Sequence, residues 1–329
     1  MKLRRVLVRT AEEIGGVVFL LLEHSARVLP ASSVYRLSRP IGHMLRPKTR
    51  RGHAIRMMKT LLDLPGWQDE DWGNLFRRHA DTVGRITLEQ IRWLRLAPAE
   101  IRRQIRVEGH ENVEPALSGP KGLVLLTAHT ANFSSVLVTA PTLGRETWGL
   151  GGQLPSWLAD RSYGRFCRSI GLDRRRPEPG ISGQLDALLN RGGVAVTFGD
   201  LTTVRHHNAW VPFCRAEILV SLGPMLLASR NGVPTVPVIS SDGPDGGPVV
   251  TFHPPLTLPQ SGDRLRDAFL MSCEFMRLVT RETEREPEKW WNWDYGRFRD
   301  HEGGTWGNVS RHEIHEFSDR ESIGVRSNN

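Results

Sequence analysis

Cysteine is scarce in this sequence, and its spacing forms no framework. Only Cys167, Cys214 and Cys273 are present, far apart and without a Cys-x-x-Cys pair. A disulfide scaffold or a cysteine zinc site needs more cysteines at closer spacing. We therefore expect free thiols, as in proteins of a reducing cytosol. No neighbouring residues mark any of the three as a nucleophile.

The sequence also lacks the short motifs of several large enzyme classes. It contains no GxxxxGK(S/T) loop, no GxGxxG after a strand and no GxSxG elbow. These absences argue against a nucleotide hydrolase, a dinucleotide-dependent enzyme and an ordinary α/β-hydrolase. No HExxH or similar metal-ligand spacing is present either, so we expect no metal and no resident cofactor.

No apolar run is long enough to cross a bilayer. The strongest candidate, residues 14–30 (IGGVVFLLLEHSARVLP), has an apolar core much shorter than the roughly 20 residues that a spanning helix needs. No small-residue cleavage site follows it, so it does not read as a signal peptide. Two interpretations remain: an amphipathic helix lying on a membrane, or a helix packed on the protein itself.

The chain has fewer acidic than basic residues. The chain of 329 residues has 44 lysines and arginines against 36 aspartates and glutamates, a formal net charge of +8. Much of the excess lies in residues 2–9 and 46–56. Such a surface favours polyanionic partners, namely anionic lipid headgroups, nucleic acid or phosphate-bearing substrates. The alternative is an ordinary solvated basic surface.

The hydrophobic pattern changes along the chain. Residues 51–64 and 71–96 carry apolar residues at helical intervals, whereas short buried strands alternate with helices from residue 122 onward. We expect an α/β fold with a mostly parallel central sheet covered by helices and a helical N-terminal segment. The predicted divisions are 1–100 (helical), 101–300 (α/β) and 301–329 (a flexible polar tail).

The first candidate site is LLTAHTANFSS, residues 125–135. His129 ends a predicted strand and precedes a helix, which is where open α/β sheets place their ligands. A histidine there can act as a general base, because its pKa lies near neutral pH. Asn132 follows at the helix start and is suited to hold the loop or bind a ligand carbonyl. The alternative is a structural histidine in a loop.

The second candidate site is residues 196–214. Asp200 also ends a buried strand, so it shares the sheet edge with His129 if the two strands are parallel neighbours. Arg205, His206 and His207 follow in a predicted loop, and Trp210 begins an extended segment. An acid and an arginine beside a histidine can orient the base or bind a phosphate. The alternative is a loop of mixed charge.

The third candidate site is PEKWWNWDYGRF, residues 287–298. It contains the aromatic residues Trp290, Trp291, Trp293 and Tyr295 within six positions. These rings can line an acyl tunnel, lie at a membrane interface or fill the core. Core filling ranks first among these interpretations. For the case in which the rings contact the substrate, Trp290 and Trp293 are the residues predicted to do so.

Jointly these three stretches resemble a known enzyme family. It contains the lipid A lauroyl and myristoyl transferases and the phosphatidylinositol mannoside acyltransferases, and the likeness runs over roughly residues 10–300. LTAHTANFSS is similar to the family's strand and His-x-x-Asn-Trp-Asp/Glu motif, WVPFC to its Val-Pro-Phe-Phe-Gly, and PEKWWNWDYGRF to its closing motif. The resemblance implies a glycerolipid-acyltransferase-like fold and a membrane-docking start.

The resemblance also implies roles for particular residues. His129 corresponds to the base that deprotonates an acceptor hydroxyl, and Asn132 to the motif asparagine. Ser134 stands where the family has the carboxylate that orients the histidine, and loss of such a carboxylate can lower the rate on the order of 10⁴-fold. Either Asp200 replaces it, or the acceptor is a stronger nucleophile, an amine or hydroxylamine. The predicted catalytic set is therefore His129, Asp200 and Ser134. Asn132, Arg205, Trp210, Trp290 and Trp293 are the predicted substrate-binding residues.

The function expected from these features is acyl transfer from an activated thioester, carried by coenzyme A or acyl-carrier protein, to a hydroxyl or amine. A glycolipid or lysolipid at the cytoplasmic face of the inner membrane is the favoured acceptor. One alternative is a cytoplasmic aminoacyl transferase that uses charged tRNA in specialised metabolism such as antibiotic biosynthesis. The other is a non-catalytic lipid- or RNA-binding relic.

Overall fold

The computed structural model describes residues 20–21, 23–25, 31–45, 48–62, 64–152, 154, 156–202, 207–299, 305–306 and 316–317. Most of the predicted 14–30 helix and of the predicted tail lies outside these residues. The part of the first segment that is described packs on the protein. Glu23 is buried there, where its carboxylate accepts a hydrogen bond from Ser162 (2.8 Å) and pairs with Arg95 (2.7 Å).

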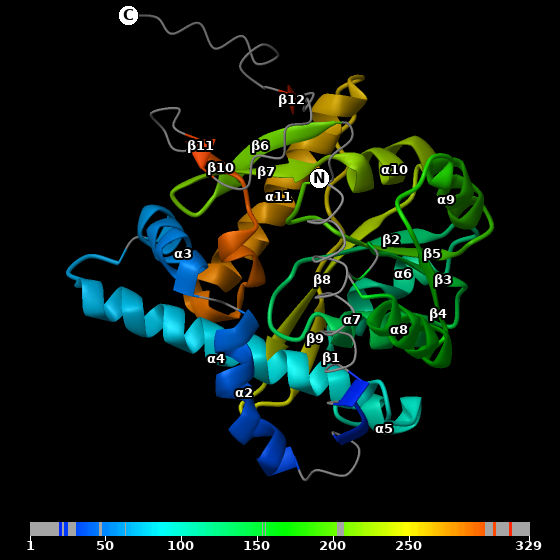
Figure 1. Cartoon of the computed structure of the whole chain (residues 1–329). Coiled ribbons are helices and arrows are strands. Elements are labelled where there is room, and N and C mark those ends of the chain that lie inside the picture. Colours follow the sequence, from blue (N-terminus) through cyan, green and yellow to red (C-terminus); the bar gives the residue numbers. More distant parts are fainter. Residues whose placement is uncertain are drawn as a thin grey trace, which may run out of the picture.

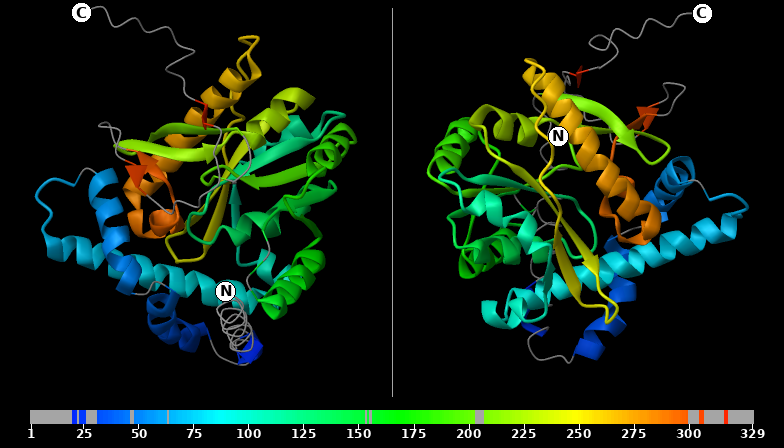
Figure 2. Two further views of the ribbon diagram at one scale, coloured as in Figure 1. Left: turned by 45° about the horizontal axis from the view of Figure 1, so that its top comes forward. Right: turned by 180° about the vertical axis from the view of Figure 1, so that it is seen from behind.

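Three helices follow the described residues 20–21 and 23–25: α2 (Ala31–Leu45), α3 (Lys48–Leu61) and α4 (Asp69–Trp93). The long helix α4 starts on three acidic residues, which suit the positive end of a helix dipole. It crosses α2 closely at two glycines. A Cβ atom on Gly42 would lie 1.8 Å from the carbonyl oxygen of Ala80, and one on Gly84 would lie 1.9 Å from that of Ser38. Both views of Figure 2 show α4 running across one end of the molecule, beneath the sheets.

Helices and strands alternate after α4, as the sequence predicts. The remaining helices are α5 (Pro98–Arg102), α6 (Glu114–Leu117), α7 (Ser134–Thr139), α8 (Trp157–Ile170), α9 (Ile181–Asn190), α10 (Gly223–Asn231) and α11 (Arg264–Arg285). The strands of the main sheet are β1 (Arg106–Glu108), β2 (Leu123–Thr127), β3 (Thr147–Leu150), β4 (Leu172–Arg175), β5 (Val194–Phe198), β8 (Thr235–Asp242) and β9 (Pro248–Phe252).

The main sheet has seven strands in the order β1-β9-β8-β2-β5-β3-β4 (Figure 1). All neighbouring strands run parallel except the antiparallel pair β8–β9. The predicted mostly parallel, helix-covered sheet is thus confirmed. Its central strands, LVLLT and VAVTF, are apolar because both of their faces are covered.

The side chains of β2 alternate between the two faces of the sheet. Leu123 and Leu125 pack in one cluster with residues of α5, α7 and α8 and the end of α4, whereas Val124 packs on the other face with residues of α9 and α10. This double cover buries the strands and leaves their carboxyl ends as the accessible edge.

A second sheet of five short strands was not predicted. Its order is β11-β10-β7-β6-β12, formed by β6 (Asn208–Phe213), β7 (Ala216–Ser221), β10 (Phe298–Arg299), β11 (Thr305–Trp306) and β12 (Glu316–Phe317). The inner side of this sheet, which includes Phe213 of β6, packs on α11 and on the buried rings of Trp290 and Trp293. In the described part of the chain, no helix has the length and apolarity to cross a membrane. The predicted domain boundaries remain predictions.

Candidate active site

The candidate site begins where two neighbouring strands end. β2 and β5 pair in parallel from Leu123 opposite Val194 to Thr127 opposite Phe198. His129 follows β2 by two residues and Asp200 follows β5 by two residues, so the matched register brings them to the same edge. The condition for their proximity, that the two strands are parallel neighbours, is therefore met.

His129 and Asp200 form a hydrogen-bonded pair. The imidazole Nδ1 lies 2.8 Å from Asp200 Oδ1, and the backbone N–H of His129 donates to Asp200 Oδ2 at 2.9 Å. Asp200 is fully buried, whereas the His129 side chain is 20% exposed. With Nδ1 turned to the carboxylate, Nε2 is the ring nitrogen available to a ligand, as in a histidine oriented by an aspartate.

Two further side chains hold Asp200 from the C-terminal region. Trp290 donates its indole N–H to Asp200 Oδ2 at 3.1 Å, and Asn292 donates its amide to the same oxygen at 2.9 Å. Burial alone would raise the pKa of Asp200, but the charge of His129, its side-chain and backbone hydrogen bonds and the hydrogen bond from Trp290 outweigh it and hold the pKa below its usual range. Asp200 is thus a carboxylate kept ionised in an apolar setting.

The segment that supplies Trp290 and Asn292 is joined to the His129 loop by backbone hydrogen bonds. Trp291 N–H donates to the His129 carbonyl at 2.9 Å, and Ala131 N–H donates to the Lys289 carbonyl at 3.0 Å. These bonds hold Ala131 in a left-handed conformation with φ of 41°, which is rare for a residue with a Cβ atom. The position of His129 therefore depends on residues about 160 positions away in the sequence.

Aromatic rings enclose the imidazole. His129 stacks on Phe198 with ring centroids 4.0 Å apart, and Phe133 meets the imidazole edge-on at 5.0 Å. Trp291 in turn contacts Phe133 at 5.2 Å. These rings keep water from most of the ring surface and hold its orientation, which favours a defined direction for Nε2.

A largely apolar cavity of about 500 Å³ opens beside His129. Its walls come from α4, the start of α7, the end of β3, α8 and β4, with Trp291 and Tyr295 from the C-terminal region. Cys167 lines it, and burial raises the pKa of this thiol to about 11, so the thiol is neutral near pH 7. The volume and lining suit a long apolar group whose reactive end lies at the histidine.

Comparison with known proteins finds a matching family model. A model described as bacterial lipid A biosynthesis acyltransferase matches residues 6–151. The matched part, less than half of the chain, is similar to this family. The match confirms the resemblance drawn from the sequence and shows that the protein is an acyltransferase. The matched residues include His129 but end before Asp200, so the pairing of the two rests on the geometry above. No curated protein matches the chain significantly.

The acyltransferase places its two motif residues differently. Asn132 is fully buried, with its amide donating to Glu89 at 2.8 Å and its side-chain oxygen accepting from Gln90 at 3.3 Å. It therefore holds the loop and does not point to a ligand. Ser134 lines the cavity, but among the described residues no hydrogen bond joins it to His129 or Asp200. Asp200, not Ser134, is the partner of His129.

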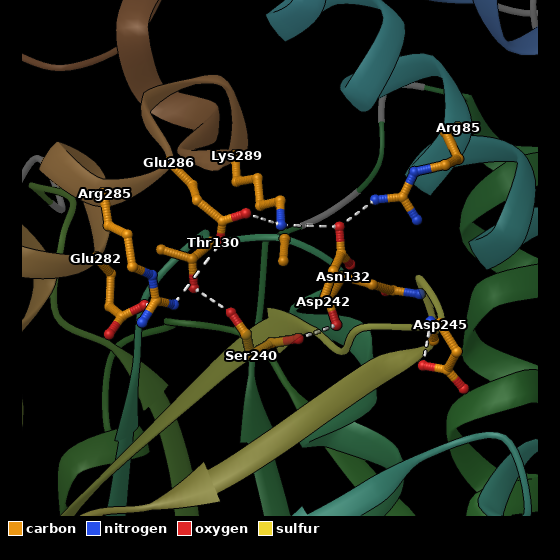
Figure 3. Close-up of polar contacts among 12 residues, drawn as sticks. Arg85, Thr130, Asn132, Ser240, Asp242, Asp245, Glu282, Arg285, Glu286 and Lys289 are labelled. Carbon is orange, nitrogen blue, oxygen red and sulfur yellow. Dashed lines mark hydrogen bonds and ion pairs between the residues drawn. The ribbon is translucent and has the colours of Figure 1, made fainter.

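A polar network supports the rear of the His129 loop (Figure 3). The Thr130 hydroxyl donates to the Ser240 carbonyl at 3.0 Å, and the Ser240 hydroxyl donates to the Asn132 carbonyl at 3.0 Å. Beyond them, Asp242 pairs with Arg85 of α4 at 2.6 Å and with Lys289 at 3.2 Å. The loop, the end of β8, α4 and the C-terminal segment are therefore tied together.

The structure does not bring the other predicted residues into the cavity of the acyltransferase. Trp290 and Trp293 are fully buried among core aromatics, and Trp210 is buried in β6 beneath Arg299. Their placement does not support a direct substrate contact. Arg205 lies outside the described residues.

Sequence reasoning missed Asn292 and did not single out the aromatic residues that line the cavity. Trp291 and Tyr295 line the cavity in place of Trp290 and Trp293. The WNWD segment is the only signal that pointed near Asn292.

Proposed function

We propose that this acyltransferase moves an acyl group from a thioester donor to a hydroxyl or amine acceptor, with His129 as the general base. The observation that carries the proposal is the His129–Asp200 pair at the mouth of an apolar cavity. A histidine that is oriented by a buried carboxylate is a well-attested general base, and the neighbouring cavity has room for an acyl chain.

The chemical step follows from this geometry. His129 Nε2 accepts the proton of the acceptor hydroxyl or amine while that oxygen or nitrogen attacks the thioester carbonyl carbon. The carbon–sulfur bond of the tetrahedral adduct then breaks, and the leaving thiolate takes the proton back from the imidazolium. The negative charge of Asp200 stabilises the imidazolium between these two steps. The proton is conserved, so no other reactant is needed.

The shape of the site supports a fatty acyl group. The cavity is lined mainly by aliphatic and aromatic side chains, which suit a hydrocarbon chain better than the polar end of an aminoacyl ester. A glycolipid or lysolipid remains the favoured acceptor because of the family relationship. No observation favours the tRNA-dependent alternative or a non-catalytic relic.

A membrane surface is the proposed source of the acceptor. Helix α2 exposes Leu37, Met44 and Leu45 beside the basic residues Arg36 and Arg39, and Leu45 also lines the cavity. Apolar and basic side chains on one exposed helix favour binding to an anionic bilayer. We propose peripheral binding at the cytoplasmic face of the inner membrane.

A donor panel tests the proposed function. Palmitoyl-coenzyme A, acyl-carrier-protein thioesters and a charged tRNA pool are each mixed with wild type, His129→Ala and His110→Ala, with lysolipid or hydroxylamine as acceptor. His110 is an exposed histidine outside the cavity and serves as the matched control. We expect thioester consumption that falls about 10²- to 10⁴-fold in His129→Ala alone. Consumption of the tRNA ester only, or activity that survives in His129→Ala, would contradict the proposal.

A further inference from the structure

A second, polar cleft lies next to the acyl cavity. It has a volume of about 280 Å³ and is formed by α8 and the end of β4. Six charged residues line it: Asp160, Arg161, Arg168, Asp173, Arg174 and Arg176. Four guanidinium groups against two carboxylates leave the cleft positively charged.

The ion pairs within the cleft orient some of the arginines. Asp160 pairs with Arg174 at 2.8 Å and with Arg176 at 2.9 Å, which fixes both guanidinium planes. Asp173 pairs instead with Arg175 at 2.6 Å. The carboxylates thus serve mainly to hold the end of β4 in place.

The two arginines on α8 are not neutralised in this way. Arg161 stacks on the exposed Trp157 ring, 5.3 Å from its centroid. Arg168, two turns further along the helix, is exposed, and neither it nor Arg161 pairs with a carboxylate among the described residues. Fork-shaped guanidinium groups that lack a carboxylate match the oxygens of a phosphate group.

The cleft and the active site lie at the same edge of the sheet. Arg174 lines both the cleft and the apolar cavity that reaches His129. β4 is separated from β2 by three strand spacings in the order β2-β5-β3-β4, which corresponds to roughly 14 Å. One extended molecule can therefore reach both His129 and the cleft.

We infer that the α8–β4 cleft binds a phosphate group of the acyl donor while the thioester lies at His129. The inference rests on the proposed function and assigns a binding place to the phosphate on the carrier arm of the thioester donor. Arg161 and Arg168 supply the main contacts, and Arg174 and Arg176, held by Asp160, form the rear wall. Free phosphate and lipid headgroups carry the same chemistry, so the experiment separates these sources.

The test compares two probes that differ only in phosphate, 4′-phosphopantetheine and pantetheine, by titration calorimetry on the full chain. The variant is Arg161→Gln with Arg168→Gln, which leaves every ion pair of Asp160 intact. The control is Arg264→Gln with Arg277→Gln, two exposed arginines of α11, which removes the same charge elsewhere. Inorganic phosphate and phosphatidylglycerol vesicles form the other arms.

We expect wild type and control to bind phosphopantetheine about tenfold or more tightly than pantetheine, and the α8 variant to lose this preference. Equal binding of both probes by wild type, or a preference that survives in the α8 variant, overturns the inference. If the α8 variant loses only the binding of vesicles, the inference is also overturned, because the arginines would then bind a lipid headgroup. The inference is supported if inorganic phosphate competes with phosphopantetheine in wild type but not in the α8 variant.

Kinetics separate this inference from the proposed function. If the cleft acts as inferred, the α8 variant raises the KM for the thioester donor and leaves kcat unchanged. If KM is unchanged in the α8 variant and acyl transfer still needs His129, only the role of the cleft in donor binding is contradicted. If no acyl transfer depends on His129, the proposed function is contradicted, whichever probes the protein binds.

Discussion

The two sides of the His129 loop differ in composition and in packing. On the cavity side the imidazole faces Phe133, Phe198 and an apolar space of about 500 Å³. On the rear side, Asp200, Asn292 and the network around Asp242 fill the space with hydrogen bonds and ion pairs. The residues that enclose the ligand space and the residues that orient the imidazole therefore lie on opposite sides of one short loop. Changes at the rear should therefore affect turnover, and changes at the front should affect which substrate is used.

The largest effect is expected at the rear, from Asp200→Asn. The variant keeps the shape of the side chain but removes the charge that stabilises the imidazolium. We expect kcat to fall on the order of 10⁴-fold with little change in KM, measured with the best donor of the panel. Asp186→Asn, at a partly exposed ion pair of α9, is the control. A loss below about tenfold would mean that Asp200 is only structural.

A smaller loss is expected from Asn292→Leu. Asn292 donates one hydrogen bond to the buried carboxylate, and a bond to a charged group stabilises by about 1.5–3 kcal/mol, or roughly 10- to 100-fold in rate. Removing the donor should also raise the pKa of Asp200, which the infrared carboxylate band measures as a function of pH. Trp290→Phe removes the other side-chain donor from this segment and should raise the same pKa. A loss of rate without a raised Asp200 pKa would indicate a packing defect instead.

The cavity side is tested by Leu137→Trp, which fills part of the apolar space. We expect kcat/KM for a long-chain donor to fall at least about tenfold relative to a short-chain donor, because the added ring occupies the volume of several methylenes. Val107→Trp, on an exposed edge strand, is the control. An equal loss for long and short donors would place the acyl chain elsewhere.

The smallest effect on rate is expected from Ser134→Ala. The serine lines the cavity but does not bond to His129, so kcat should change by less than about fivefold, the value of one ordinary hydrogen bond. A loss of kcat comparable with that of Asp200→Asn would mean that Ser134 is the partner of His129. The residues behind the loop would then not be the ones that orient the imidazole.

The lowered pKa of Asp200 also predicts how stability depends on pH. A carboxyl whose pKa is lower in the folded than in the unfolded state stabilises the fold above its ordinary value of 3.8. That stabilisation disappears as pH falls through the folded-state pKa. Urea unfolding at pH 5 and pH 3 should therefore show a larger loss for wild type than for Asp200→Asn. Equal losses would mean that other carboxyls carry the acid sensitivity.

The sequence predicted the residues at the strand ends better than the residues that the C-terminal segment adds to the site. The apolar runs of β2 and β5 predicted parallel strands, and their matched ends predicted the proximity of His129 and Asp200. Asn292 could not be predicted, because it lies 163 residues from His129 and only tertiary folding brings it there. Trp290 and Trp291 are adjacent, and no periodicity shows which ring faces the core. The second sheet was missed because two of its outer strands hold only two residues each.

We claim that His129 and Asp200 act as one unit, and a double-mutant cycle tests this. The value of kcat/KM is measured for wild type, His129→Ala, Asp200→Asn and the double variant, with one thioester donor and one acceptor. If Asp200 acts only through His129, the double variant should be no slower than His129→Ala. Losses that multiply in the double variant would show two independent contributions and would contradict the claim.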